Sequence, residues 1–245
     1  MLTPARRSGR EVLDDPATDA ALRLRSIGDV TRANRWLGGM QAALYPLRLT
    51  FRTLVGRRRT EATLLDVGTG LADIPEAARR EAAELGLTLQ VFGCDEAPAL
   101  LEAARARLDA PVAASAIALP FRARSVDVAM CSQLLHHFDF TDARYVLREL
   151  DRVAIVRVVV SDIRRSWLPV WGLWLMSFLL RFHPVSRRDG MLSILKGFTP
   201  DELGQLVLDA TGVRPVVETH AGWRITASWE PSGGFAEHRG GTTGR

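Results

Sequence analysis

Two alternating apolar patterns between residues 62 and 229 constrain the fold of this chain most strongly. Short apolar runs alternate with segments in which apolar residues recur every three or four positions, as on one face of a helix. The runs predict strands at 63–67, 87–94, 111–114, 126–131 and 153–161. The helical segments between them lie at 74–85, 97–108 and 142–152. This strand–helix order predicts an α/β fold, in which helices cover both faces of a mostly parallel sheet.

The end of this region changes to an antiparallel pattern. Thr199 and Glu202 form a predicted capping box at the start of a helix that Gly212 ends. Two further apolar runs, 213–220 and 224–229, are separated only by a short turn containing Gly. They predict a hairpin, so one edge strand of the sheet should run antiparallel to the others.

The N-terminal region, residues 1–61, precedes the first strand and reads as a helical lid. Residues 1–19 are polar and rich in turn formers, and we expect them to be mobile. Apolar residues over 20–47 follow a helical spacing, which the pair Gly38-Gly39 divides in two.

The remaining boundaries follow from composition. The predicted α/β domain spans 62–230, and residues 164–198 interrupt its rhythm as a cap insertion. Residues 231–245 are rich in Gly, Ser, Pro and Thr and predict a disordered tail.

Charge and cysteine content narrow the classes of function. The chain has 32 basic residues, of which only Lys196 is lysine, and a net charge of +4. The arginine runs are short and lack interleaved aromatic residues, so we expect no nucleic-acid partner. Cys94 and Cys131 end apolar runs without a CxxC pair, so we expect buried thiols and no metal site.

Targeting signals give no indication of secretion. The N-terminus has no long apolar segment typical of a signal peptide. The most apolar stretch, residues 167–180, is too short to span a bilayer. We therefore expect a cytoplasmic protein.

The stretch LLDVGTGLADIP, residues 64–75, ends the first strand with features of a ligand site. Glycines at 68 and 70 allow a backbone to approach a ligand closely. The third glycine of a dinucleotide site and the lysine of a P-loop are both missing. Asp66 would repel a pyrophosphate and suits a cation, while Asp73 is predicted as an N-cap with Glu76 completing a capping box.

The second strand ends at another acid, Asp95, 25 residues after Gly70. A carboxylate at this strand tip can accept hydrogen bonds from both hydroxyls of a ribose. Asp66 and Asp95 together therefore suit a nucleoside that carries positive charge.

These stretches, followed by ASAIALPFRARSVDVAMCSQLLHHF and VVVSDIRRS, resemble successive motifs of class I S-adenosylmethionine-dependent methyltransferases. The resemblance covers about residues 62–229 and is strongest for the small-molecule branch, which includes methyltransferases of ubiquinone and menaquinone biosynthesis and O-methyltransferases of polyketide phenols. It implies a Rossmann-like, seven-stranded sheet with S-adenosyl-L-methionine as the cofactor.

The resemblance also implies roles for residues of the cofactor site. The loop residues Gly68, Thr69 and Gly70 would pass under the methionine part, with Asp66 orienting the loop and the amino group. Asp95 would bind the ribose, assisted by Glu96. Further predicted contacts are Ser115, Ala116 and Ser132.

Ser115 departs from the family pattern, in which an aspartate before LPF contacts the adenine amino group. Serine can still form a hydrogen bond, but without charge assistance. Weaker cofactor binding, or adenine held mostly by backbone near Ala116, follows as a hypothesis.

His136 and His137 follow the fourth predicted strand and are candidate general bases for an acceptor hydroxyl. Adjacent residues of a helical turn point about 100° apart, so we expect at most one of them to face the acceptor. Their alternative role is packing or helix capping. Asp162 ends the fifth strand and would orient a substrate, or instead form a cap or a salt bridge to Arg164 or Arg165.

The acceptor pocket should come from the lid and the cap insertion. The insertion concentrates Trp, Phe and Met side chains over 167–182. A helix formed by this stretch would be apolar around almost its whole circumference. Its surplus surface suits a channel for an alkyl chain, a homodimer contact or a peripheral membrane contact.

Together these features predict a methyltransferase that acts on a small apolar acceptor in secondary metabolism, by O-methylation of a phenolic or quinol-like lipid or polyketide. The alternatives are C-methylation of a quinone precursor and a catalytically silent cofactor-binding module. A dinucleotide-dependent reductase is disfavoured by the missing third glycine.

Overall fold

A computed structural model describes residues 3–9, 11–12, 15 and 17–232 of the chain. Its strands are β1 (Glu61–Val67), β2 (Thr88–Asp95), β3 (Ala110–Ala113), β4 (Val126–Ser132), β5 (Ala154–Ile163), β6 (Val216–His220) and β7 (Arg224–Trp229). Its helices are α1 (Ala20–Trp36), α2 (Gly39–Gly56), α3 (Asp73–Glu84), α4 (Pro98–Ala104), α5 (Phe140–Val153), α6 (Trp167–Leu179), α7 (Pro184–Lys196) and α8 (Pro200–Thr211).

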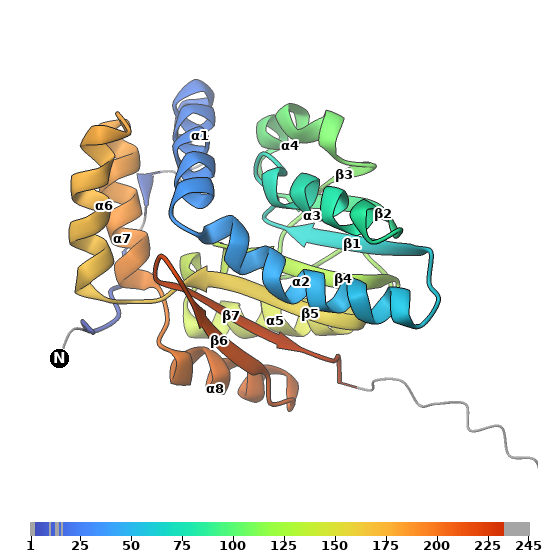
Figure 1. Cartoon of the computed structure of the whole chain (residues 1–245). Helices are drawn as coiled ribbons and strands as arrows, with labels where there is room; N and C mark the ends of the chain where they lie inside the picture. The colour runs from blue at the N-terminus through green and yellow to red at the C-terminus, as the bar shows by residue number, and fades with distance from the viewer. Residues whose placement is uncertain (1–2, 10, 13–14, 16, 233–245) are drawn as a thin grey trace, which may run out of the picture.

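The strands form one sheet in the order β3-β2-β1-β4-β5-β7-β6 (Figure 1). The first five strands of this order are parallel, and β7 pairs antiparallel with both β5 and β6. The predicted Rossmann-like sheet and its antiparallel end are thereby confirmed. The strand order reverses between β1 and β4, and the crevice beyond their carboxyl ends is where ligands bind in open α/β sheets.

Helices cover both faces of the sheet and bury two apolar clusters (Figure 1). Helices α2 and α3 pack on one face, where Phe51 and Leu64 are fully buried. Helices α5 and α8 pack on the other, around Leu147 and Phe198. Strands β4 and β5 contain the apolar runs 128–131 and 158–160, because both of their faces are covered.

Several local predictions are confirmed and one is wrong. Thr199 and Glu202 form the capping box of α8, and Cys94 and Cys131 are free, buried thiols. The N-cap of α3, however, is Ala72 in the left-handed conformation, and Asp73 is the first helical residue. The capping box predicted there fails because the GTG turn runs one residue shorter than we expected.

The lid is divided at the glycine pair, as predicted. Helix α1 ends at Trp36, and Gly38, with φ of 78°, starts α2 in a new direction. Helix α2 packs on the sheet, whereas α1 stands beyond the carboxyl edge, beside the α6–α7 pair (Figure 1). Polar contacts hold α1 there: Asp29 accepts a hydrogen bond from the backbone of His183, at 2.9 Å.

The two ends of the chain differ from the sequence prediction in part. The described residues near the N-terminus are held against the cap, since Arg6 Nε donates to the Lys196 carbonyl at 2.8 Å and Arg7 N to the Leu195 carbonyl at 3.0 Å. At the other end, Ser232 N donates to Asp151 at 3.0 Å, and the rest of the predicted tail lies outside the described residues.

No helix in the described part of the chain is both long and apolar enough to cross a membrane.

The turn between β6 and β7 supports the lid through a close backbone contact. A Cβ atom on Gly222 would lie 2.0 Å from the Leu37 carbonyl oxygen, and the φ of Gly222 is 73°. Gly212 has a similar φ of 75° but no atom within 4 Å of such a Cβ. A substitution at Gly212 would therefore introduce backbone strain alone, whereas one at Gly222 would also introduce a steric clash with the lid.

We expect Gly222→Ala to lower the melting temperature more than Gly212→Ala. Both variants carry the left-handed strain, about 1–2 kcal/mol, but only Gly222→Ala must also displace the junction of α1 and α2. Thermal unfolding of both variants measures the difference. Equal losses would contradict the tight contact.

Candidate functional site

The loop after β1 folds back on the end of β2. Gly68 and Gly70 have φ values of 72° and 53°, in the left-handed region. The backbone N–H groups of Gly68 and Thr69 donate to the Cys94 carbonyl at 2.8 and 3.0 Å. A Cβ on Gly68 would lie 2.8 Å from the Leu134 side chain, so this position needs glycine.

Asp95 fixes this loop from the tip of β2. One oxygen of its carboxylate accepts from Gly70 N at 3.0 Å, and the other accepts from Ala97 N at 2.9 Å. Burial raises the pKa of Asp95 while these backbone hydrogen bonds lower it, and burial prevails. Each oxygen keeps a free lone pair, so the carboxylate can still accept two hydrogen bonds from a ligand.

Asp66 lies deeper, near the end of β1 between Gly93 and Met130 of the neighbouring strands. It is 3% exposed, and its Oδ1 atom has no hydrogen-bond partner among the described residues. Burial raises its pKa to about 8, and the nearby carboxylates of Asp73 and Asp95 act in the same direction. The group is therefore mostly protonated at neutral pH unless a cation binds close to it.

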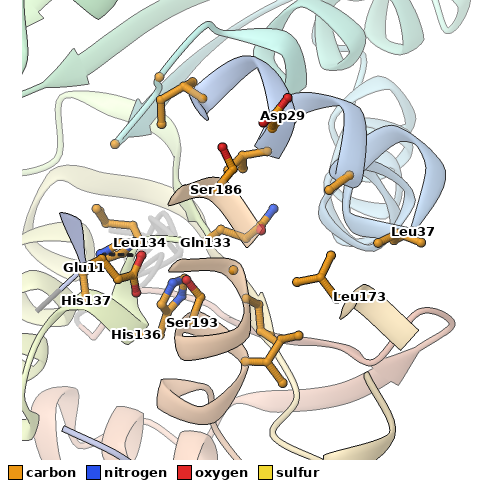
Figure 2. A pocket seen from close by; sticks show the side chains of 18 of the residues that line it. Glu11, Asp29, Leu37, Gln133, Leu134, His136, His137, Leu173, Ser186 and Ser193 are labelled. Carbon is orange, nitrogen blue, oxygen red and sulfur yellow. Dashed lines mark ion pairs between the residues drawn. The ribbon is translucent and has the colours of Figure 1, made fainter. Parts of the chain in front are cut away.

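A cavity of about 1090 Å³ opens beyond this edge of the sheet, between α1, α4, α6 and α7 (Figure 2). This is slightly above the volumes usual for ligand pockets, about 300–1,000 Å³, and leaves room for two ligands. Its apolar wall comes from the lid and the cap, and includes Ile27, Val30, Leu37, Pro169, Leu173, Met176 and Phe182.

The polar end of the cavity contains a buried histidine–aspartate pair. His136 Nδ1 lies 2.6 Å from Asp162 Oδ1, and the backbone N–H of His136 donates to Asp162 Oδ2 at 3.1 Å. Burial raises the pKa of Asp162, but the charge and hydrogen bond of His136 outweigh it and hold the pKa below its ordinary value. The carboxylate therefore keeps the proton of His136 on Nδ1. The other ring nitrogen, Nε2, is buried and has no hydrogen-bond partner within the described part of the chain.

His137 stacks on His136, with ring centroids 4.3 Å apart. Both residues lie on a 3-10 turn, Leu135–His137, and both line the cavity. That at most one of them faces the acceptor stays a prediction. His137 Nδ1 lies 3.8 Å from Glu11, the ion pair drawn in Figure 2.

Glu11, His136 and His137 place ligand-type atoms within 4.8 Å of one another, which is the spacing of a metal site. The Glu11 carboxylate, however, already binds the Lys196 ammonium at 3.0 Å. A cation is thus in place beside the carboxylate, and the cluster fits a salt-bridged group better than a metal centre.

Most of the predicted site residues meet at this cavity. Those that line it are Gly68, Gly70, Asp95, Glu96, Ala116, His136 and His137. Those that lie beside or behind the lining are Asp66, Thr69, Ser115, Ser132 and Asp162. Ser115 is half-buried between two lining residues, Ala114 and Ala116.

Asp162 binds His136 and not the arginines that follow it. Arg165 pairs with Glu202 at 2.6 Å, and the backbone N–H of Arg164 donates to the Trp223 carbonyl. The salt-bridge alternative for Asp162 is therefore wrong.

Sequence reasoning missed seven polar residues of the lining, namely Glu11, Arg23, Asp29, Gln133, Ser186, Ser193 and Arg224. Only Gln133 carried a usable signal, since it follows a strand directly, where parallel sheets place their ligand sites. It adopts a φ of 51° and hydrogen-bonds Asn34 of the lid.

Residues 65–157 match a protein family described as "Methyltransferase domain". No curated protein sequence matches the chain.

Among solved structures, a candidate S-adenosyl-L-methionine-dependent methyltransferase from Methanococcus maripaludis superposes with a TM-score of 0.58 at 11% identity, covering 94% of this chain and 98% of that one. An O-methyltransferase family 2 protein from Planctomyces limnophilus, solved with apigenin, superposes with a TM-score of 0.57 at 16% identity. The match covers 90% of this chain and 65% of that one. A candidate O-methyltransferase from Nostoc punctiforme superposes with a TM-score of 0.53 at 17% identity, and this chain spans 60% of the length of that protein.

The sheet order, the family match and these neighbours define a Rossmann-like methyltransferase fold. The chain thus contains a methyltransferase domain over residues 65–157, in a fold that S-adenosylmethionine-dependent methyltransferases share.

The edge of the sheet fits this cofactor. Asp95 retains acceptor capacity for two hydroxyls, and Asp66 Oδ1, which has no partner among the described residues, would suit a cationic group. No lysine stands in the loop to bind a phosphate. These groups suit an uncharged sugar joined to a cationic group.

Asp66→Asn is expected to stabilise the ligand-free protein at neutral and alkaline pH. Between an ordinary pKa of 3.8 and the native value of about 8, the native state binds more protons at Asp66 than the unfolded state. The free energy of unfolding therefore falls by about 1.4 kcal/mol for each pH unit in this window, and Asn removes that loss.

Urea unfolding of both proteins between pH 4 and 9 measures this effect. The difference should be smallest at pH 4 and largest above pH 8. Glu102→Gln, which changes an exposed carboxylate paired with Arg105, is the matched control and should give a flat difference. A flat difference for Asp66→Asn would show that its pKa is not raised.

Proposed function

We propose that this methyltransferase acts on a hydroxyl of a small apolar acceptor, a phenolic or quinol-like lipid or polyketide of secondary metabolism. The observation that carries the proposal is the pair of His136 and Asp162, buried at the polar end of a largely apolar cavity. His136 Nε2 is buried and has no partner among the described residues, so it is available to an acceptor.

For the residues at the sheet edge, we propose the cofactor-binding roles that the methyltransferase resemblance implies. Asp95 binds the ribose hydroxyls with help from Glu96, and the loop Gly68–Gly70 supports the methionine part. Asp66 holds that loop and the amino group. Ala116 and Ser115 contact the adenine, and Ser132 closes the site from β4.

When bound, S-adenosylmethionine supplies a methyl carbon that its sulfonium already activates. The protein's own residues need only align the acceptor, exclude water and accept a proton. Orientation alone supplies about 7–11 kcal/mol in well-aligned reactions. A phenol has an ordinary pKa of about 10, so a base adds to the rate at neutral pH.

His136 is the base in this proposal, and Asp162 is its positioning residue. Asp162 keeps the proton on Nδ1, so that Nε2 presents a lone pair to the acceptor hydroxyl. This arrangement favours O-methylation over C-methylation of a quinone precursor. It also favours an active enzyme over a silent cofactor-binding module, which has no need of a buried base.

The size and apolar lining of the cavity support the acceptor class. Leu37, directly after α1, and Leu173 of α6 project into the same space (Figure 2). The Planctomyces limnophilus structure that shares this fold was solved with apigenin, which agrees with a phenolic acceptor.

The domain roles complete the proposal. Residues 1–61 act as the lid and 62–230 as the methyltransferase domain, with 164–198 as its acceptor-binding cap. Hydrogen bonds join lid and cap directly, such as Ser186 Oγ to Ser26 Oγ at 3.0 Å.

The outer face of α6 suits a membrane surface. Seven large apolar side chains are exposed along it, at positions 167, 168, 171, 174, 175, 178 and 179. The inner face of the same helix lines the cavity through Leu173 and Met176. Arg181 and Arg188 near the helix end are exposed and complement anionic lipid headgroups. A lipid acceptor could then enter from the bilayer, and a homodimer through this face is the competing arrangement.

His136→Gln should reduce methyl transfer at pH 7 by about 10²–10⁴-fold, measured with labelled cofactor and a panel of alkylresorcinols and quinols. The loss should shrink toward pH 10, where the acceptor hydroxyl ionises without a base. His137→Gln is the control and should lose much less. An equal loss at both pH values would exclude His136 as the base, and transfer only to peptides or nucleic acid would exclude the acceptor class.

A variant with Trp171→Ser, Leu175→Ser and Leu179→Ser should lose most sedimentation with vesicles of phosphatidylglycerol and phosphatidylcholine. Trp36→Ser, which changes an exposed tryptophan of α1, should sediment like the wild type. If the triple variant binds vesicles normally, membrane contact through α6 is wrong. If it instead changes from dimer to monomer in sedimentation equilibrium, the face is a protein interface.

A further inference from the structure

Arg224 is a buried basic residue of the cavity to which the proposed reaction assigns no role. It is the first residue of β7, directly after the turn that supports the lid, and it lies opposite Ile163 at the end of β5. The residue is 6% exposed, and it lines the cavity together with Ile163 and Trp223. Its charge is therefore held at the end of the cavity that contains the pair of His136 and Asp162.

The guanidinium of Arg224 lacks the partners that other buried cations have. Within the described part of the chain, Arg165 and Lys196 are the other basic residues buried to a similar degree. Arg165 pairs with Glu202 at 2.6 Å, and Lys196 pairs with Glu11 at 3.0 Å. Arg224 forms no ion pair with a described residue, and its Nε atom is buried without a hydrogen-bond partner.

The guanidinium of Arg224 keeps its positive charge at neutral pH. Burial lowers the pKa of Arg224 to about 10, while the charge of Asp162 raises it. Asp162 compensates Arg224 only in part, because its oxygens already bind His136 and the backbone N–H of Ile163. A buried cation without a hydrogen-bonded partner is unfavourable, and an anion that enters the cavity relieves that penalty.

Resting on the proposed function, we propose that Arg224 binds an anionic oxygen of the acceptor. The acceptor class thus narrows to apolar molecules that carry an acidic group. The anion has two possible sources with the same chemistry, namely the ionised hydroxyl that receives the methyl group, or a separate carboxylate. In either case Arg224 orients the acceptor beside His136, and the planar guanidinium favours this oxygen over neutral groups of the same shape.

Three probes test this with enzyme saturated by S-adenosylhomocysteine, in which no methyl transfer occurs: pentylresorcinol, its carboxylated derivative and pentylbenzene. Calorimetry compares the wild type with Arg224→Met and Arg224→Lys. Arg23→Met is the matched control, because Arg23 also lines the cavity but donates to the Asp15 carbonyl at 2.7 Å.

If a carboxylate is the anion, the wild type should bind the carboxylated probe at least about tenfold more tightly than pentylresorcinol. If the ionised hydroxyl is the anion, pentylresorcinol should instead bind more tightly as the pH rises toward 10. Arg224→Met should abolish whichever preference is seen, Arg224→Lys should restore part of it, and Arg23→Met should keep it. Binding of pentylbenzene should be the same in all four proteins.

The proposal would be overturned if Arg224→Met kept the binding preference of the wild type. It would also be overturned if the wild type showed neither tighter binding of the carboxylated probe nor tighter binding of pentylresorcinol at high pH. A folding measurement gives a second criterion. Removal of an unpaired buried charge should raise the melting temperature of the ligand-free protein, and a lower value would reveal a protein partner for Arg224 and overturn the proposal. Methyl transfer by the wild type distinguishes the two hypotheses: if it methylates a hydroxyl while Arg224→Met keeps its preferences, only the role of Arg224 is wrong.

Discussion

The carboxylate of Asp95 is the contact on which the cofactor end of the site depends. It joins two turns by accepting hydrogen bonds from Gly70 N and Ala97 N, and so fixes the loop after β1 against the tip of β2. The left-handed glycines of that loop bring its backbone to the edge of the cavity. Without this junction, the loop would lose the position that brings it to the proposed ligand.

A second carboxylate organises the opposite end. Asp162 binds both the ring and the backbone of His136, although the two residues are 26 positions apart in the chain. This contact links the end of β5 to the turn after β4, and it turns a buried histidine into a candidate base. Lid and cap line the space between the two ends with apolar side chains such as Ile27, Leu173 and Met176.

The sequence predicted the sheet well because strands buried on both faces leave apolar runs, such as 128–131 in β4 and 158–160 in β5. The hairpin and the break at Gly38 were also readable, since each depends on local turn chemistry. The cap was less readable: residues 164–198 form two helices, and the apolar pattern of α6 cannot separate its cavity face from its exposed face.

The site was predicted where it follows strand ends and missed where it depends on tertiary contacts. Asp66, Asp95 and His136 directly follow or end apolar runs, so their position at one edge follows from the parallel order. The pairing of Asp162 with His136, and the isolation of Arg224, depend on side-chain packing between distant segments. Glu11 reaches the cavity from the segment before α1, whose sequence carries no periodic signal.

A crystal structure with bound S-adenosylhomocysteine tests the central claim most directly. The account predicts ribose hydroxyls within hydrogen-bonding distance of Asp95, the amino-acid part over the loop Gly68–Gly70, and the sulfur facing the space beside His136. A ligand bound elsewhere, with the Asp95 carboxylate making no contact to it, would contradict the account.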